Sequence, residues 1–162
     1  MDRLNTTVTA TAPIFRGPGI GPRHNVVGAT HCYKLLPEET GGALAVWEVE
    51  LEPGAGAPPH RHAEEEEAFY VVAGMVTISA DDSAPERLGP GSFFFAPRNS
   101  SHVFRNEGPD YAKLLVLASP AANLVAMFGR MDAAANGAGG IAPLEEIVGI
   151  AARHGVAILP PG

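Results

Sequence analysis

The feature that most constrains this chain is a pair of histidines, His60 and His62, set just before the strand-like run AFYVV at residues 68–72. Residues two apart on an extended segment point to the same side, so the two imidazoles would converge on one point. Glu67 can add a carboxylate if the chain folds back, and a later segment supplies a third imidazole from His102. This donor set suits a divalent first-row transition metal with open positions for water, dioxygen or substrate.

The four consecutive glutamates at residues 64–67 leave the acidic ligand to be decided. On a strand, Glu66 would face the side opposite to Glu67, and therefore Glu67 is favoured as the ligand. Taken alone, the run would be a solvated turn, and a single histidine in a strand is usually structural. The prediction of a metal site depends on all four residues acting together: His60, His62, Glu67 and His102.

Short apolar runs separated by Gly, Pro and Asp turns fill residues 24–119. Strand signals about every eight to twelve residues are typical of an all-β fold, here a double-stranded antiparallel β-barrel of the jelly-roll type. Apolar and polar residues alternate along residues 45–51, which predicts a half-buried strand with its apolar side inward. Trp47 lies on that side, where it either fills the core or forms the wall of a pocket.

Other aromatic and histidine residues fall around this predicted barrel. Phe104 shares a strand face with His102, which makes it a candidate pocket residue. Residues 93–95 are three consecutive phenylalanines. They predict a strand that is covered on both sides, by the barrel interior and by another sheet or a dimer partner. His24 and His31 lie outside the ligand spacing. Each is expected to be partly exposed or hydrogen-bonded and not a ligand, although one of them could reach the pocket as an acid or base.

After the last predicted strand the apolar residues take a helical period. Leu124, Phe128 and Met131 recur near helical spacing, and a second helix begins near Pro143 and ends near His154. His154 is placed to favour a helix C-terminus, so it is not expected to be a ligand. The chain is thus predicted to have a tail or arm at residues 1–23, the barrel at 24–119, and at 120–162 two helices and a tail that docks along the barrel as a short edge segment.

Composition excludes several classes of function. The chain has 162 residues, 46% of them hydrophobic and 18% charged, with a net charge of −7. No basic patch is available to neutralise phosphates, which argues against nucleic-acid binding. No apolar run approaches the roughly 20 residues of a membrane helix, and the start of the chain has no apolar signal core, so we expect a cytoplasmic protein without membrane contact. The single cysteine, Cys32, is expected to be a small buried residue.

The spacing around the histidines resembles the two motifs of the cupin superfamily. The positions that carry the resemblance in the first motif are Gly54, His60, His62, Glu67 and Gly74, and those in the second are Gly91, Pro97, Asn99, His102 and Asn106. Asn99 stands where the family usually has glycine, but asparagine tolerates a left-handed backbone better than other residues with a side chain. The resemblance covers roughly residues 43–118 and implies the same barrel.

The wider sequence looks like small bacterial cupins similar to quercetin 2,3-dioxygenase. This resemblance implies a homodimer with one divalent transition metal per chain, which is Fe, Mn, Ni, Co, Cu or Zn. It also implies a dioxygenase that acts on a flavonol-like or other enol or phenol small molecule, with Glu67 as the catalytic base. Dry aromatic walls would protect the reactive anion, and the residues expected to form them are Trp47, Phe69, Phe94 and Phe104.

Two other functions fit the same residues. In a non-oxidative enzyme, the metal acts as a Lewis acid that polarises a carbonyl for isomerisation, decarboxylation or the ring closure of a polyketide. In a binding protein, the barrel holds a small molecule without catalysis. The sequence identifies neither the metal nor the substrate, because the same four ligands accept several ions.

Overall fold

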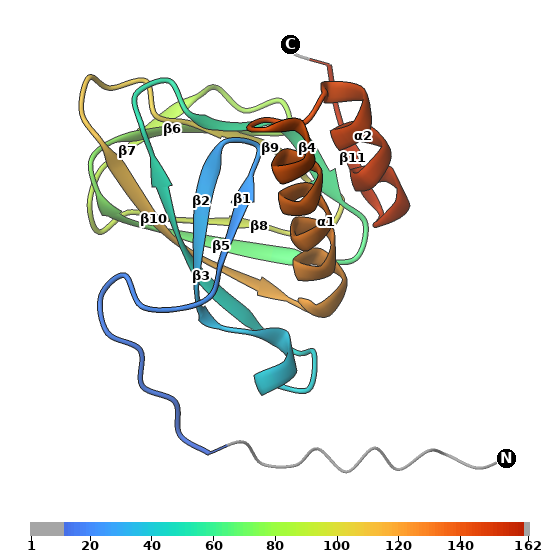
Figure 1. The fold of residues 1–162 in the computed structure, drawn as a ribbon. Helices are drawn as coiled ribbons and strands as arrows, with labels where there is room; N and C mark the ends of the chain where they lie inside the picture. The colour runs from blue at the N-terminus through green and yellow to red at the C-terminus, as the bar shows by residue number, and fades with distance from the viewer. Residues whose placement is uncertain (1–11, 161–162) are drawn as a thin grey trace, which may run out of the picture.

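Two antiparallel β-sheets face each other in the computed structural model, which describes residues 12–160 (Figure 1). The strand order is β1-β2-β3-β10-β5-β8 in the first sheet and β11-β4-β9-β6-β7 in the second. The strands are β1 (Arg23–Val26), β2 (Ala29–Leu35), β3 (Ala45–Leu51), β4 (Gly56–His62), β5 (Glu66–Ala73), β6 (Val76–Ala80), β7 (Glu86–Leu88), β8 (Phe93–Ala96), β9 (Ser101–Arg105), β10 (Ala112–Ser119) and β11 (Val156–Ile158). The predicted all-β jelly-roll fold is confirmed.

Strand β3 illustrates how alternation in the sequence builds the inner face of a sheet. Trp47 and Val49 are each 1% exposed, so this side of the strand belongs to the core. Glu48 and Glu50 lie on the other side, where their carboxylates are 3.6 and 3.2 Å from the ammonium group of Lys113 on β10. Because β3 pairs with both β2 and β10, its core side chains are held from both edges.

Strand β8 is only half covered. It is the last strand of the first sheet and pairs with β5. Phe94 packs toward Phe69, with 5.6 Å between the ring centroids, but Phe93 and Phe95 are 63% and 50% exposed. The expected cover by another sheet is therefore absent over the outer face of β8 within residues 12–160. Cover by a dimer partner stays a prediction.

The two helices predicted at the C-terminal end are present as α1 (Ala122–Ala138) and α2 (Leu144–Arg153), and a short 3-10 helix, η1, occupies Pro37–Glu39. Helix α1 packs beside β1 and against α2 (Figure 1). After α2 the chain returns as β11, which pairs with β4 so that Val156 lies opposite His62 and Ile158 opposite His60. The tail thus docks on the barrel as an edge strand, as predicted, beside the strand that carries two candidate ligands.

The turn before β9 brings the second motif to the first. Asn99 has a φ of 65°, so it takes the left-handed conformation expected for this position. Its backbone N–H donates a hydrogen bond of 2.8 Å to the carbonyl oxygen of His62. The start of β9, and with it His102, is therefore held against the end of β4.

Candidate metal centre

The three histidines of the predicted site come from neighbouring strands of one sheet. His60 and His62 lie on the same side of β4, and His60 is directly opposite His102 in the register between β4 and β9. Directly paired residues on antiparallel strands have adjacent side chains, which explains the distance of 4.3 Å between the ring centroids of His60 and His102. All three side chains are buried, with exposures of 9%, 4% and 3% for His60, His62 and His102.

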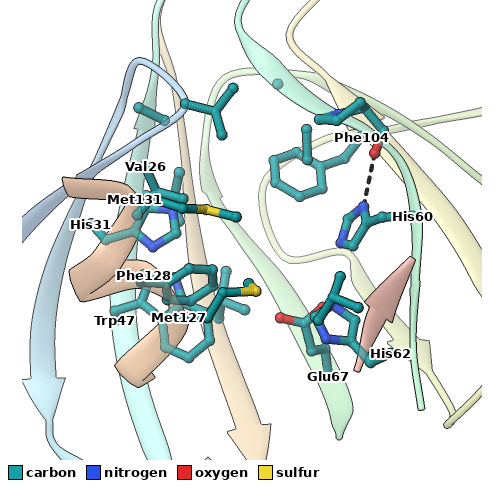
Figure 2. Close-up of a pocket in the computed structure, with 18 of the residues that line it drawn as sticks. Val26, His31, Trp47, His60, His62, Glu67, Phe104, Met127, Phe128 and Met131 are labelled. Carbon is teal, nitrogen blue, oxygen red and sulfur yellow. Dashed lines mark hydrogen bonds and ion pairs between the residues drawn. The ribbon is translucent and has the colours of Figure 1, made fainter. Parts of the chain in front are cut away.

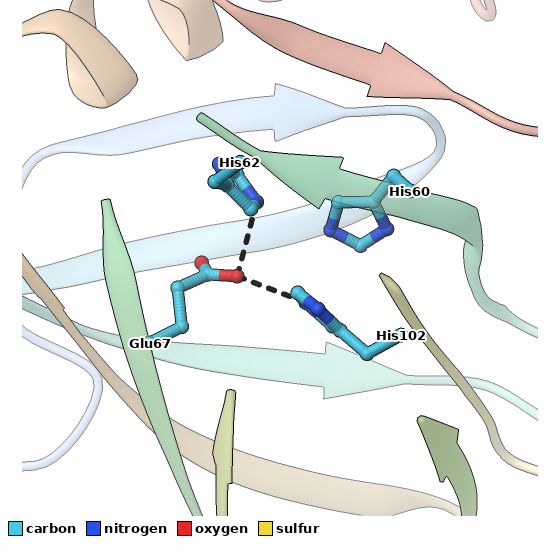
Figure 3. A group of neighbouring side chains, drawn as sticks. All are labelled: His60, His62, Glu67 and His102. Carbon is cyan, nitrogen blue, oxygen red and sulfur yellow. Dashed lines mark hydrogen bonds and ion pairs between the residues drawn. The ribbon is translucent and has the colours of Figure 1, made fainter. Parts of the chain in front are cut away.

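Glu67 reaches the histidines from the opposite sheet. It lies near the start of β5, and its Oε2 atom is 3.1 Å from Nε2 of His62 and 3.1 Å from Nε2 of His102 (Figure 3). One ligand atom from each of the four predicted residues lies within 4.8 Å of the others. The structure therefore brings together all four predicted ligands, His60, His62, Glu67 and His102.

Electrostatic coupling sets the protonation of this group. Burial raises the pKa of Glu67, but His62 and His102 outweigh it and hold that pKa well below its usual range. Burial lowers the pKa of His62, but the carboxylates of Glu67 and Glu65 more than compensate and raise it to about 10. Burial and the neighbouring His102 lower the pKa of His60 to about 4. At neutral pH the metal-free cluster thus contains an anionic Glu67, a neutral His60 and a positively charged His62.

The donor set fits a single divalent transition metal. His60 donates its Nδ1–H to the carbonyl oxygen of Pro58 at 2.8 Å, which leaves Nε2 with a free lone pair. Three imidazoles and one carboxylate are ligands that Fe, Mn, Co, Ni, Cu and Zn all accept, so these ligands do not identify the metal. A metal would displace the proton that His62 carries, because a ligating imidazole must be deprotonated at the donor nitrogen.

The glutamate run divides between the two faces of the chain. Glu66 points away from the cluster and lies 3.6 Å from Arg98, with its side chain 43% exposed. Glu67 points inward, and so does Glu65, which is 1% exposed and has its Oε2 atom 3.5 Å from Nδ1 of His62. The choice of Glu67 over Glu66 agrees with this geometry. The interpretation of the run as a solvated turn missed Glu65, although alternation from Glu67 would have placed it on the same face.

The cluster opens into a cavity of about 80 Å³ between the two sheets (Figure 2). Figure 2 shows His60, His62 and Glu67 on one side and His31, Trp47 and Phe128 on the other. Most of the remaining wall is apolar, and helix α1 contributes part of it through Met127, Phe128 and Met131. A substrate inside the cavity would therefore be shielded from water while touching the candidate metal site.

His31 is the polar residue of the wall facing the cluster. Its ring stacks on Trp47 with centroids 5.8 Å apart and meets the edge of Phe128 at 4.8 Å. Burial lowers the pKa of His31 to about 3, so the ring is neutral at physiological pH. Its Nδ1 atom is buried without a hydrogen-bond partner among the residues that the structure describes. Of the two histidines outside the ligand spacing, His31 is thus the one that reaches the pocket, whereas His24 contacts the hydroxyl of Tyr33 at 3.0 Å.

Three of the four predicted pocket residues line the cavity. Trp47, Phe69 and Phe104 form part of its wall, and Trp47 both fills the core and borders the cavity. Phe94 is not among the lining residues but packs behind Phe69, and its ring centroid is 6.1 Å from that of His102. The structure thus does not place Phe94 in the wall of this cavity.

Comparison with known proteins agrees with this fold. Residues 47–118 match the family model described as a cupin domain. This segment is therefore similar to a cupin domain. A predicted oxalate decarboxylase from Thermotoga maritima shares the fold, with a TM-score of 0.59 at 20% identity over 66% of this chain and 98% of that one.

Two of the proteins to which this chain is similar are described as enzymes. Dimethylsulfoniopropionate lyase DddQ from Ruegeria pomeroyi is 31% identical over 90 residues, which are 52% of this chain and 43% of the lyase. A sugar phosphate isomerase from Silicibacter pomeroyi is 27% identical with a TM-score of 0.50, over 57% of this chain and 59% of that one. The chain spans less than two thirds of the length of the curated relatives it matches.

Membrane insertion through a helix finds no support in the structure. Neither helix within residues 12–160 is long and apolar enough to cross a bilayer. The cytoplasmic location stays a prediction.

Proposed function

We propose that this protein is a non-oxidative metal-dependent enzyme that acts on a small carbonyl compound, as a lyase, isomerase or decarboxylase. The observation that carries this proposal is the cluster of three histidines and Glu67 at the wall of a small, mainly apolar cavity. The lyase and the isomerase among the relatives support the same class of chemistry. None of the relatives described above is named as a dioxygenase, so the dioxygenase predicted from the sequence ranks second.

The size of the cavity argues against a flavonol. Its volume of about 80 Å³ is well below the roughly 300–1,000 Å³ typical of pockets for drug-sized ligands. A three-ring flavonol would require the wall formed by Met127, Phe128 and Met131 to move away. A substrate with few heavy atoms needs no such movement.

The charge of the cavity argues against a phosphorylated substrate. Among the described residues that line it there is no lysine or arginine, and the two charged groups, Glu67 and His62, both belong to the candidate metal site. A phosphate at the end of the cavity away from the metal would lose its hydration without gaining a cationic partner, which is strongly unfavourable. We therefore infer a substrate that is uncharged at the end away from the metal.

Each group of the cavity has a defined task in such a reaction. When bound, the metal supplies a Lewis acid that polarises a carbonyl or stabilises the enolate formed from it. Glu67 is ionised, and Oε1, the oxygen that does not contact the histidines, can accept the proton that leaves the carbon next to the carbonyl. The neutral ring of His31 can hydrogen-bond a hydroxyl or carbonyl at the far end of the substrate. Trp47, Phe69 and Phe104 exclude water from the resulting anion.

The first test is metal content followed by proton exchange. Elemental analysis of the purified protein should give about one transition metal per chain, and His62→Ala should lose it. The metal-loaded protein should then catalyse deuterium incorporation from D₂O into dihydroxyacetone or acetoacetate, followed by NMR, but not into dihydroxyacetone phosphate. Protein stripped with a chelator is the control.

Oxygen uptake separates the two leading functions. With quercetin or another enol in an oxygen electrode, we expect no consumption beyond the rate of the stripped protein. Consumption of oxygen in proportion to the product formed would favour the dioxygenase function instead. If the metal-loaded protein neither exchanges protons nor consumes oxygen, but these compounds still protect it against thermal unfolding, the domain is a binding protein and the proposal is wrong.

A further inference from the structure

Glu65 is a buried carboxylate that the ligand set does not include. It is 1% exposed, whereas Glu64 directly before it is an exposed residue. Acidic side chains are almost never buried to this extent unless they have partners. The partners of Glu65 are His62 on one side and Asn123 of helix α1 on the other.

The contact with His62 determines which nitrogen of that ring can bind a metal. Nε2 of His62 faces Glu67 at 3.1 Å, and Nδ1 faces Glu65 Oε2 at 3.5 Å. A neutral imidazole carries one proton, so Nε2 is free to donate its lone pair only if the proton is on Nδ1. Neither Nδ1 of His62 nor Oε2 of Glu65 makes a hydrogen bond within residues 12–160, and the 3.5 Å between them is an ion-pair contact. Glu65 is therefore the acceptor placed to hold that proton.

Without Glu65 the preference would reverse. The remaining carboxylate, Glu67, lies on the Nε2 side, so the proton would move to Nε2 and occupy the lone pair that the metal needs. In His60 the backbone carbonyl oxygen of Pro58 accepts a hydrogen bond from Nδ1 at 2.8 Å, so the proton stays on Nδ1 and the Nε2 lone pair is free. Two of the candidate ligands thus have an acceptor behind the ring, which is the usual arrangement at metal sites.

Glu65 is itself held by the C-terminal helices. Asn123 donates from Nδ2 to Glu65 Oε1 at 3.1 Å and to the backbone carbonyl of His154 at 2.8 Å. His154, at the C-terminal cap of α2, donates in return from Nδ1 to Oδ1 of Asn123 at 2.8 Å. This chain of contacts, from His154 through Asn123 and Glu65 to His62, joins a part of the protein outside the matched cupin segment to the candidate metal centre.

We propose that Glu65 is a positioning residue that keeps the His62 ring in the tautomer and orientation needed for metal binding, and that Asn123 and His154 of the C-terminal helices hold Glu65 in place. This inference rests on the metal site of the proposed function. It assigns the helices a role in metal binding in addition to covering the barrel.

The test is the metal affinity of the full-length protein with a matched pair of variants. Glu65→Leu removes the buried acceptor, and Glu64→Leu makes the same change on the exposed neighbour. Loss of an outer partner of a metal-binding histidine typically costs about 10- to 100-fold in metal affinity. We expect a loss of this size in the Zn²⁺ affinity of Glu65→Leu, measured by competition with a chromophoric chelator, and a change of less than about twofold for Glu64→Leu. Glu65→Gln, which keeps an acceptor oxygen, should fall between them.

Two further readouts separate positioning from a general loss of structure. The visible absorption spectrum of the Co²⁺-loaded protein should change in Glu65→Leu and stay unchanged in Glu64→Leu. Nitrogen-15 NMR of the Zn²⁺-loaded wild type should find the proton of His62 on Nδ1. If Glu65→Leu does not fold, Asn123→Leu takes its place, since it leaves every carboxylate intact and should weaken Zn²⁺ binding by about three- to tenfold.

The outcomes distinguish this inference from the proposed function. If the wild type binds neither Zn²⁺ nor Co²⁺, the metal site itself is wrong. If the wild type binds both ions and Glu65→Leu matches Glu64→Leu in affinity and spectrum, the metal site stands and the role of Glu65 is refuted. A proton on Nε2 of His62 in the loaded wild type would refute it as well.

Discussion

A histidine at position 31 makes the fold less stable. Its Nδ1 atom is buried without a partner, and such an unsatisfied group costs about 1–3 kcal/mol. We expect His31→Leu to raise the free energy of unfolding by about 1 kcal/mol in urea titrations and to keep the metal, while proton exchange falls at least tenfold. His24→Leu is the control that should lose stability, because His24 contacts the hydroxyl of Tyr33. Full exchange activity in His31→Leu would show that His31 has no role with the substrate.

The raised pKa of His62 predicts how the metal-free protein responds to pH. In the folded protein this pKa is about 10, against roughly 6.5 for a histidine in an unfolded chain. The stabilisation from the charged ring is therefore complete below about pH 6.5 and is lost as the pH rises toward 10. In chelator-treated protein, the drop in unfolding free energy between pH 6 and pH 9.5 should be smaller in His62→Gln by a few kcal/mol, since one pKa unit corresponds to about 1.4 kcal/mol. Equal drops in the two proteins would contradict the assignment.

At this scale the sequence predicted the direction of side chains better than their surroundings. Alternation along a strand was enough to prefer Glu67 to Glu66, and the structure places them on opposite faces as expected. Glu65 was missed because four identical residues differ only in where the strand begins and what packs against it. His31 could not be placed because its neighbour Phe128 comes from a helix almost a hundred residues later.

Helix α1 is both part of the core and a wall of the cavity. Leu124 and Met127 are 0% and 3% exposed on the same helix, but only Met127 lines the cavity. Truncating either residue to alanine should cost about 2–5 kcal/mol in denaturant unfolding. Only Met127→Ala should also enlarge the cavity and let larger ketones protect the metal-loaded protein against thermal unfolding. If larger ketones protect Leu124→Ala equally well, the effect comes from looser packing of α1 as a whole and not from the cavity wall at Met127.

The period of apolar residues predicted the first helix, the start signal at Pro143 and the end signal at His154 predicted the second, and the tail was predicted to be an edge segment. The sequence did not predict with which strand, or in which register, this edge segment pairs. Val156 and Ile158 lie opposite His62 and His60 because β11 pairs with β4, and no local signal in the sequence specifies that partner. The role of these elements at the candidate site therefore became visible only in the assembled fold.

The whole molecule exposes aromatic side chains at one edge of its first sheet. Phe93 and Phe95 are 63% and 50% exposed on β8, whose outer edge has no partner strand in the described part of the chain. Exposed apolar residues on an unpaired edge favour association, and we expect the predicted homodimer to form there. The double variant Phe93→Ser and Phe95→Ser should sediment as a monomer. Leu144→Ser, which changes a 69% exposed residue of α2, should leave the dimer intact.

The dimer prediction has two ways to fail. A wild type that sediments as a monomer at micromolar concentration would exclude a stable dimer, and a double variant that remains dimeric would place the interface elsewhere. The sequence could predict the barrel itself, since strand spacing and two motifs agree on it. It could not decide whether the outer face of β8 meets solvent or a second chain, because both leave the same pattern of phenylalanines.

Trp47 is the single tryptophan of the chain, and it borders the cavity while stacking on His31. All tryptophan fluorescence of this protein therefore originates at the wall of the cavity in which a ligand would bind. Emission should shift or be quenched when the cavity fills, and a nearby paramagnetic ion such as Cu²⁺ should quench it while Zn²⁺ does not. The protein thus carries its own optical reporter, with which candidate ligands and metals can be screened without a label and before any reaction is known.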